Sequence, residues 1–379
     1  MMINFARICT RCVCDTTIPN IQFDENGVCN FCKSHDLLLQ YYQQDKARRQ
    51  DKLSELITKI RGKGIGKKYD CIMGVSGGTD STYALYLAKQ LGLRPLAVHF
   101  DNGWDTDIAT KNIENAVSIL DIDFFTYTVD WEEFRNLQVA FLKASVPGIE
   151  VPTDVAIHGT LYKTAIANDI KYILGGQSFM TEGTVPREWS YMDGTYVKSV
   201  NKKYGRIPLR TYPNATIYQI AYNTFVRGIK QIPFLNYIQY NKKEAQQVLK
   251  KELGWTYYGG HHHENIYTKF SSAWYLKKKF SIDKRKISLS GPVRMGHISR
   301  EEALEELGKE PPIEPELVEY CIKKLELSQQ QFDDIMTLPL KAFHDYHTSY
   351  NMLQRFRFFV KLAVKMNIIT PVLYEKYIE

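Results

Sequence analysis

The stretch that most constrains this chain is residues 70–81, Asp-Cys-Ile-Met-Gly-Val-Ser-Gly-Gly-Thr-Asp-Ser. An apolar run of strand length leads into Ser-Gly-Gly, and apolar side chains at helical spacing follow from Tyr83 to Leu91. Adjacent glycines permit a tight turn that approaches a ligand closely, and the first turn of a helix offers unpaired N–H groups that suit a phosphate. The stretch therefore predicts a strand, a phosphate-binding loop and a helix. It lacks the Walker lysine, which excludes the P-loop of kinases and GTPases.

Residues 76–81, Ser-Gly-Gly-Thr-Asp-Ser, resemble the PP-loop of the ATP pyrophosphatase superfamily, whose members cleave ATP to AMP and pyrophosphate. The resemblance implies that this loop binds ATP and that Asp80 also takes part in catalysis. An ordinary strand–turn–helix junction with a capping Asp and Ser is the alternative. The residues expected to bind ATP here are Ser76, Gly77, Gly78, Thr79, Asp80 and Ser81.

The size and charge of the chain narrow its class. Its 379 residues favour two or three folding units. A net charge of +7 is mild for this length, and it suits anionic ligands such as ATP or a nucleotide sugar without requiring nucleic acid. No stretch approaches the roughly 18 apolar residues of a membrane span, and the first residues lack a signal-peptide core. We therefore expect a cytoplasmic protein with no membrane insertion and no nucleic-acid partner.

Five of the seven cysteines lie near the N-terminus. Cys9 with Cys12 and Cys29 with Cys32 form two C-x2-C pairs separated by sixteen residues. This spacing matches the four-cysteine zinc pattern, because each pair presents two thiolates to one side of a tetrahedral ion. Cys14 lies outside the spacing and is interpreted as a bystander. Four thiolates close the coordination of zinc, so a structural knuckle is favoured over catalytic thiols.

Strand-length apolar runs alternate with helical stretches of 10 to 15 residues after residue 66. This alternation predicts an α/β fold with a doubly wound parallel sheet. Residues 35–60 read as one long helix, which the glycines at 62–66 break. The predicted units are residues 1–34 (zinc knuckle), 35–66 (helical linker), 67–210 (nucleotide-binding domain), 211–298 (region contacting substrate and pyrophosphate) and 299–379 (helical C-terminal region).

Acidic residues follow several of the predicted strands. Ligands of open parallel sheets gather at the carboxyl ends of the strands, so Asp101, after the strand at 95–100, is expected to meet the adenosine end of ATP. Glu150, Asp154 and Glu182 flank other strand ends. Their carboxylates are candidates for holding Mg²⁺, which prefers oxygen ligands. Helix capping by Asp154 and a simple turn at Glu182 are the alternatives.

Several stretches, taken in order, resemble the N-acetyl sugar amidotransferase family of bacterial surface-polysaccharide (lipopolysaccharide O-antigen) and flagellin-glycan pathways. The resemblance runs from about residue 8 to 310. The stretches that carry it are the Cys9–Cys32 knuckle, 76–81, 97–104 (Ala-Val-His-Phe-Asp-Asn-Gly-Trp), 149–154, 171–176 with 181–183, 281–285 (Ser-Ile-Asp-Lys-Arg) and 296–303. The family usually has Lys where this chain has His261, and residues 177–179 and 290–294 also depart from its pattern. These departures bear on the identity of the sugar more than on the ATP chemistry.

The resemblance implies an ATP-dependent amidotransferase that converts an N-acetyl group of a sugar into an acetamidino group. The amide oxygen would attack the α-phosphorus of ATP, pyrophosphate would leave, and ammonia would displace AMP from the O-adenylyl imidate. Further ATP-binding residues would be His99 and Gly176, with Lys284 and Arg285 stabilising the pyrophosphate. His262, His263 and Glu264 are candidates for contacting the sugar or a metal. The implied cofactors are ATP, Mg²⁺ and structural Zn²⁺.

The chain has no recognisable glutaminase motif. The family implies that a separate glutaminase subunit and a barrel-type channel subunit, similar to the pair of histidine biosynthesis, deliver the ammonia; free ammonium is the alternative. The rival functions are a PP-loop tRNA-modifying enzyme of the thiolase or lysidine-synthase type and a non-enzymatic scaffold. Few thiols outside the knuckle and the modest net charge disfavour the RNA enzyme. We also expect the apolar segment 355–364 to pack on the protein core, with packing on a partner as the alternative, and Lys277 to Lys279 to be surface cations.

Overall fold

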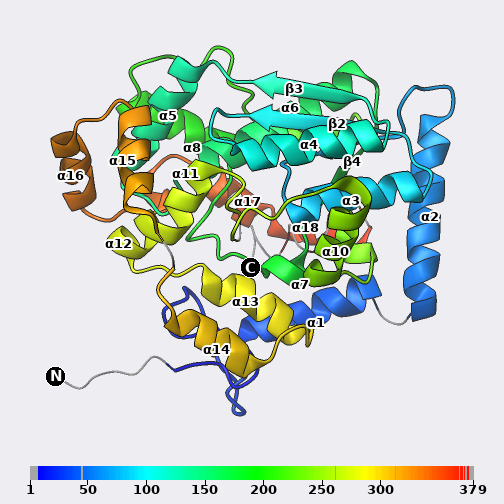
Figure 1. The fold of residues 1–379 in the computed structure, drawn as a ribbon, viewed down its shortest axis with the longest axis horizontal. Coiled ribbons are helices and arrows are strands. Elements are labelled where there is room, and N and C mark those ends of the chain that lie inside the picture. The colour runs from blue at the N-terminus through cyan, green and yellow to red at the C-terminus, as the bar shows by residue number, and fades with distance from the viewer. Residues whose placement is uncertain are drawn as a thin grey trace.

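The computed structural model describes residues 7–43, 46–260, 262–311, 313–366, 368–369, 371 and 374. A five-stranded sheet with the order β3-β2-β1-β4-β5 lies at its centre, and every neighbouring pair is parallel (Figure 1). The predicted doubly wound sheet is therefore confirmed. The strands are β1 (Cys71–Gly74), β2 (Pro95–Asp101), β3 (Phe124–Thr128), β4 (Tyr172–Gly175) and β5 (Lys230–Pro233). Strand β5 was not predicted, because four residues ending in proline give little strand signal.

The strand order reverses between β1 and β4, which are neighbours in space but far apart in the chain. Successive side chains of a strand point to opposite faces of the sheet. Cys71 and Met73 of β1 accordingly join the apolar cluster on one face, whereas Ile72 joins the cluster on the other. The first face is covered by α3 (Thr79–Gln90), α4 (Asp107–Ile119) and α10 (Lys242–Leu253), and the second by α6 (Val151–Ala167). Such a reversal is where open α/β sheets bind ligands.

Two helices replace the single long helix expected over 35–60. They are α1 (Asn30–Gln43), which starts inside the second cysteine pair, and α2 (Lys46–Gly64). Tyr42 of α1 and Ile60 of α2 are both buried in the cluster on the first face of the sheet. The prediction of one continuous helix was wrong, because each half uses its own apolar side to cover the sheet.

The described residues from 299 onward are mainly helical, as expected. Lys279 is not a surface cation: it is buried, and its Nζ donates to the carbonyl oxygens of Met336 at 3.2 Å and Leu338 at 3.3 Å. The remaining helices are α5 (Trp131–Ala144), α7 (Phe179–Glu182), α8 (Gly194–Tyr204), α9 (Ile217–Phe225), α11 (Ile266–Lys269), α12 (Leu276–Phe280), α13 (Arg285–Arg294), α14 (Arg300–Gly308), α15 (Pro315–Lys324), α16 (Gln329–Thr337), α17 (Tyr350–Arg355) and α18 (Arg357–Lys365). A π-helical turn, Phe270–Tyr275, joins α11 to α12.

The segment 355–364 was expected to pack on the core, but it does not. Phe358 and Phe359 of α18 are 71% and 62% exposed, and Ala363 is the one fully buried side chain in the described part of this helix. The apolar density of the sequence was the correct observation, but it does not by itself decide whether a helix face is covered. None of the described helices combines the length and the apolar character that crossing a membrane requires.

Candidate nucleotide and metal sites

The glycine-rich loop joins β1 to α3 at the reversal of strand order. Gly77 has φ of +73°, and a Cβ there would lie 2.2 Å from the carbonyl oxygen of Ala109 in α4. Gly176, after β4, is equally tight, since its Cβ would lie 2.7 Å from Cα of Ser81. The Ser81 hydroxyl accepts the backbone N–H of Ser76 at 3.2 Å. The predicted strand, loop and helix are confirmed, and close packing requires glycine at both positions.

A downstream segment holds the loop in place. The indole N–H of Trp255 donates to the carbonyl oxygen of Gly77 at 2.9 Å, and the hydroxyl of Tyr258 accepts the N–H of Thr79 at 3.2 Å. Asn112 of α4 donates both to Gly77 and to the carbonyl oxygen of Thr256, at 3.2 and 2.8 Å. The loop is therefore preorganised by residues around 255–258. The sequence analysis gave these residues no role, because nothing in their local pattern relates them to the loop.

Asp80 points to two partners that the sequence analysis also missed. Lys242, at the start of α10, donates from Nζ to Oδ2 of Asp80 at 2.8 Å, and the hydroxyl of Tyr240 donates to Oδ1. Burial disfavours the ammonium of Lys242, but the charges of Asp80 and Glu182 outweigh it and raise its pKa above the ordinary range. Lys242 thus remains charged, and it places a cation beside the loop.

Two of the predicted acidic residues, Glu182 and Glu264, lie on either side of His262. The imidazole of His262 has Nδ1 3.4 Å from Oε1 of Glu264 and Nε2 3.8 Å from Oε1 of Glu182. A Cβ on Gly78 would lie 2.8 Å from Oε1 of Glu264, so this carboxylate lies against the loop. Burial and the negative charge of Asp80 raise the pKa of Glu182 to about 6. The structure therefore gathers Asp80, Glu182 and Glu264 around the glycine-rich turn.

Backbone pairing brings the segment 264–266 to this site. Asp105 and Asn265 form an antiparallel bridge, the N–H of Thr106 donates to the Glu264 carbonyl at 3.0 Å, and that of Ile266 donates to Trp104 at 2.8 Å. The segment just after β2 therefore fixes the position of residues 264–266 by backbone hydrogen bonds. His263 takes no part in the carboxylate cluster, because its ring lies against Gly260. His261 lies outside the described residues.

Glu150 is buried at the N-terminus of α6, with 8% of its surface exposed. Its Oε2 accepts the hydroxyl of Thr268 at 2.8 Å, while its Oε1 has no hydrogen-bond partner among the described residues. Burial, with a smaller effect of the Asp154 charge, raises the pKa of Glu150 to about 7. Glu150 holds the N-cap position of α6, so capping by Asp154, the alternative weighed above, is wrong.

Other predicted residues have structural partners. Arg285 pairs with Asp283 at 2.7 Å and donates to the carbonyl oxygens of Glu306 and Lys309 at the end of α14, so its guanidinium is engaged away from the loop. Lys284 lies near Glu150, and its positive charge offsets part of the rise that burial causes in the pKa of Glu150. The expectation of a paired Lys-Arg clamp on pyrophosphate is thus not supported for Arg285.

The two residues expected at the end of β2 also stabilise local structure. His99 is buried, with Nδ1 2.9 Å from the Val75 carbonyl oxygen and Nε2 3.1 Å from the Asp105 carboxylate. Asp101 accepts the N–H of Gly103 at 2.9 Å, which fixes the turn after the strand. Both lie in the carboxyl-terminal half of β2, and their contact with a nucleotide stays a prediction.

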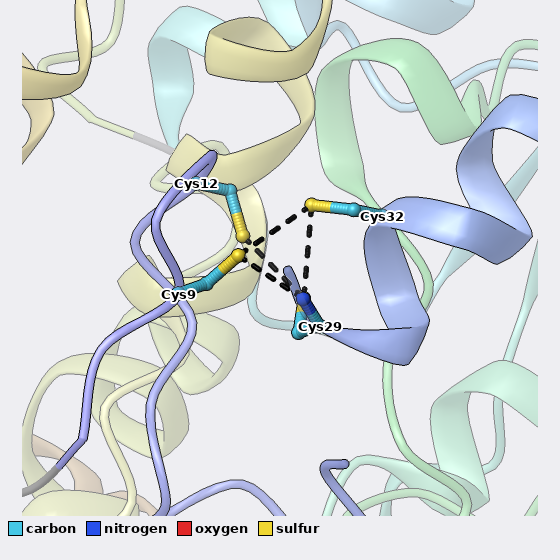
Figure 2. Close-up of side chains that lie close together, drawn as sticks. All are labelled: Cys9, Cys12, Cys29 and Cys32. Carbon is cyan, nitrogen blue, oxygen red and sulfur yellow. Dashed lines mark hydrogen bonds between the residues drawn. The ribbon is translucent and has the colours of Figure 1, made fainter. Parts of the chain in front are cut away.

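The four predicted metal ligands converge (Figure 2). The sulfur atoms of Cys9, Cys12, Cys29 and Cys32 are all buried and lie within 4.8 Å of one another. Three pairs are separated by 3.7 to 3.9 Å. A tetrahedral zinc ion with Zn–S bonds of about 2.3 Å holds its sulfurs about 3.8 Å apart, whereas an iron–sulfur cluster, with several irons between the thiolates, spreads them further. The four thiols therefore form a candidate metal site, and zinc as its occupant stays a prediction.

The comparisons with known proteins agree with these features. Residues 264–361 match the family described as LPS biosynthesis protein WbpG-like, C-terminal domain. This segment, about a quarter of the chain, is similar to that C-terminal domain. It begins at Glu264, the residue whose carboxylate lies against the glycine-rich loop. The match confirms the resemblance to surface-polysaccharide biosynthesis proteins over residues 264–361.

Two curated proteins match shorter stretches. The chain is 35% identical over 71 residues to a tRNA(Ile)-lysidine synthase of Chlamydia pneumoniae, and 31% identical over 113 residues to an uncharacterized protein of Methanocaldococcus jannaschii. The matches span 18% and 29% of this chain. They cover only 22% and 38% of those proteins' own lengths, well under two thirds. The activity of neither whole protein transfers to this chain.

Several solved structures are similar in part. They include NMN synthetase from Francisella tularensis (14% identity, TM-score 0.31, covering 77% of this chain and 98% of that one), NH3-dependent NAD synthetase from Campylobacter jejuni (14%, 0.30, 77% and 98%) and the U34-tRNA thiolase NcsA from Methanococcus maripaludis with its [4Fe-4S] cluster (15%, 0.33, 77% and 89%). Similarities with TM-scores this low do not indicate what this chain does.

Proposed function

We propose that this protein is an ATP-dependent amidotransferase that converts an N-acetyl group of a sugar into an acetamidino group during bacterial surface-glycan synthesis. One observation carries the proposal: the WbpG-like LPS-biosynthesis segment and the PP-loop meet at Glu264. A loop that suits phosphates and a domain associated with lipopolysaccharide synthesis thus contribute to one site.

The reaction needs positioning and charge neutralisation. An amide oxygen is a poor leaving group and has to be activated first. The oxygen attacks the α-phosphorus of ATP, pyrophosphate departs, and the oxygen is now part of an adenylyl ester. The positive end of the α3 dipole and the ammonium of Lys242 would supply positive charge for the phosphates. The carboxylates of Asp80, Glu182 and Glu264 are oxygen ligands of the kind that suit Mg²⁺. Bound Mg²⁺ would neutralise phosphate charge.

Ammonia then attacks the imidate carbon, AMP leaves, and an amidine remains. Ammonium cannot attack until it has lost a proton. Glu150, with a buried, unpartnered oxygen and a pKa of about 7, suits the acceptance of that proton near neutral pH. Delivery of ammonia by a glutaminase subunit and a barrel-type channel subunit belongs to this proposal, as does a cytoplasmic location.

The alternative is a tRNA-modifying enzyme, which the short match to a lysidine synthase favours. Both reactions release pyrophosphate, so the acceptor has to be identified. The purified protein is incubated with ATP, Mg²⁺ and ammonium, and either a panel of di-N-acetylated nucleotide sugars and nonulosonates or bulk tRNA. Pyrophosphate and the mass of each sugar are measured.

The proposal expects pyrophosphate release together with a sugar lighter by about one mass unit, because NH replaces oxygen. A Glu264→Gln variant should lose the release, whereas Glu301→Gln on the exposed side of α14 should keep it. Release stimulated by tRNA alone, with every sugar unchanged, would sink the amidotransferase and support the RNA enzyme.

A further inference from the structure

Helix α13 contacts the cysteine knuckle and two other helices. It lies between the cysteine knuckle, α14 and α7 (Figure 1). Lys284 at its start is near Glu150, and Arg294 at its end reaches the metal ligands. One short helix therefore contacts the knuckle at one end and lies near Glu150 at the other, and neither the sequence nor the proposed function gives this arrangement a role.

Arg294 points into the thiol cluster. Its Nε lies 3.3 Å from the sulfur of Cys32, and its Nη2 lies 3.3 Å from that of Cys12 and 3.4 Å from that of Cys14. Four thiolates around a divalent ion carry a net charge of −2, which is costly to bury. A guanidinium offers several donors in a rigid fork and stays charged. Arg294 is thus placed to neutralise part of that charge and to orient two of the ligands.

Further bonds fix the knuckle to the same helix. Ser290 accepts the backbone N–H of Val13 at 3.3 Å, and Lys286 pairs with Asp15 at 2.6 Å. Arg300 of α14 donates to the carbonyl oxygens of Cys9 and Cys12. The metal ligands and α13 are consequently built as one unit, so a change in the knuckle would move the helix.

One and two turns before Arg294, α13 packs against α7 without space for side chains. A Cβ on Gly291 would lie 2.8 Å from the Met180 carbonyl oxygen, and a Cβ on Gly183 would lie 2.8 Å from that of Ile287. Backbone therefore rests on backbone at both places. Glu182, which lies 3.8 Å from His262, is the last residue of α7. A displacement of α13 would reach this carboxylate directly.

We propose that Arg294 is the counter-charge of the metal centre, and that metal binding positions Glu182 through α13 and α7. Arg294 is a positioning residue here, since it touches the metal ligands and not the reacting groups. This role of the knuckle needs no RNA contact, and it does not depend on which substrate the enzyme uses.

The test compares Arg294→Met and Arg294→Lys with Arg210→Met, a matched change at an exposed arginine. Zinc affinity is measured by competition with a chromogenic chelator, and Co²⁺-substituted protein reports the tetrathiolate geometry by its absorption spectrum. Losses of metal affinity on removal of an outer-shell partner are about 10- to 100-fold. We expect a loss of this size for Arg294→Met, a smaller one for Arg294→Lys, and none for Arg210→Met.

The second arm measures backbone hydrogen exchange of the wild-type protein before and after metal removal. Faster exchange in residues 179–183 and in α13, with the distant strand β3 unchanged, is the expected result. Equal zinc affinity in Arg294→Met and Arg210→Met would overturn the counter-charge. Unchanged exchange at 179–183 would overturn the coupling to Glu182. If Arg294→Met fails to fold, Arg294→Lys against Arg210→Lys decides by the same affinity criterion.

Discussion

Replacing Lys242 with Met tests the charge balance beside the loop. The change removes the ammonium that lies 2.8 Å from Asp80 and leaves the Asp80 carboxylate with the Tyr240 hydroxyl alone. A hydrogen bond to a charged group contributes about 1.5–3 kcal/mol. Because the side chains of Lys242 and Asp80 keep 27% and 12% exposure, solvent offsets part of the loss. We therefore expect a decrease of about 2 kcal/mol in the free energy of unfolding at pH 7.

The decrease should depend on pH in a defined direction. Glu182 has a folded-state pKa of about 6, above its ordinary value of 4.5, so its charge costs stability once the pH rises through that range. Lys242 lowers the pKa of Glu182, so the variant should raise it further. Protonation of Glu182 relieves the repulsion at pH 5, and the difference between the two proteins should be smaller there than at pH 7.

Urea denaturation at pH 5 and pH 7, followed by tryptophan fluorescence, measures both quantities. For a chain of this length, about 2 kcal/mol corresponds to a fall in Tm of roughly 2–4 °C, which calorimetry resolves. Lys243→Met, at the exposed neighbouring position, is the control and should change little. A Lys242→Met effect no larger than that of the control, or one that grows toward pH 5, would refute the reasoning.

Three further predictions concern separate features. In Glu150→Gln, the rise in ammonium-dependent product formation through about pH 7 should disappear, because the titrating carboxyl is gone; an unchanged pH–rate profile argues against this role. Gly77→Ala should destabilise the protein by more than the 1–3 kcal/mol of backbone strain, since its Cβ also meets Ala109, whereas Gly66→Ala, with φ of +75° and open space, should show the strain alone in denaturant melts. Cys14→Ser should keep one zinc per chain by metal analysis; loss of the metal would make Cys14 a ligand.

Local patterns predicted the parts of the fold that depend on neighbouring residues. The alternation of strands and helices, the loop at 76–81 and the four cysteine ligands were all recognised, since each is encoded within a few residues. Failures arose where tertiary context decides. Residues 355–364 were apolar enough for a core, yet α18 leaves its phenylalanines exposed. The helix expected over 35–60 became two, because both halves cover the sheet.

The candidate site was predictable only for residues with a motif of their own. Asp80, Glu182 and Glu264 were named in advance, and the structure brings them together. Lys242 and Tyr240 were missed, because their contact with Asp80 spans about 160 residues and leaves no periodic trace. Arg285 was assigned to the pyrophosphate, since charge alone does not reveal that its guanidinium binds the end of α14.

The contact between Arg294 and the cysteine knuckle also fixes an order of events during synthesis. The thiols of Cys12 and Cys32 leave the ribosome first, while Arg294 follows 262 residues after Cys32. Synthesis at about 5–20 residues per second separates the two by roughly 13–50 seconds. Under the proposal above, any metal bound by the knuckle during that time would be held without the counter-charge of Arg294. Arg294 is made only when more than three quarters of the chain is complete, so a metal centre that begins to form at the N-terminus is completed by a residue from the C-terminal part of the chain.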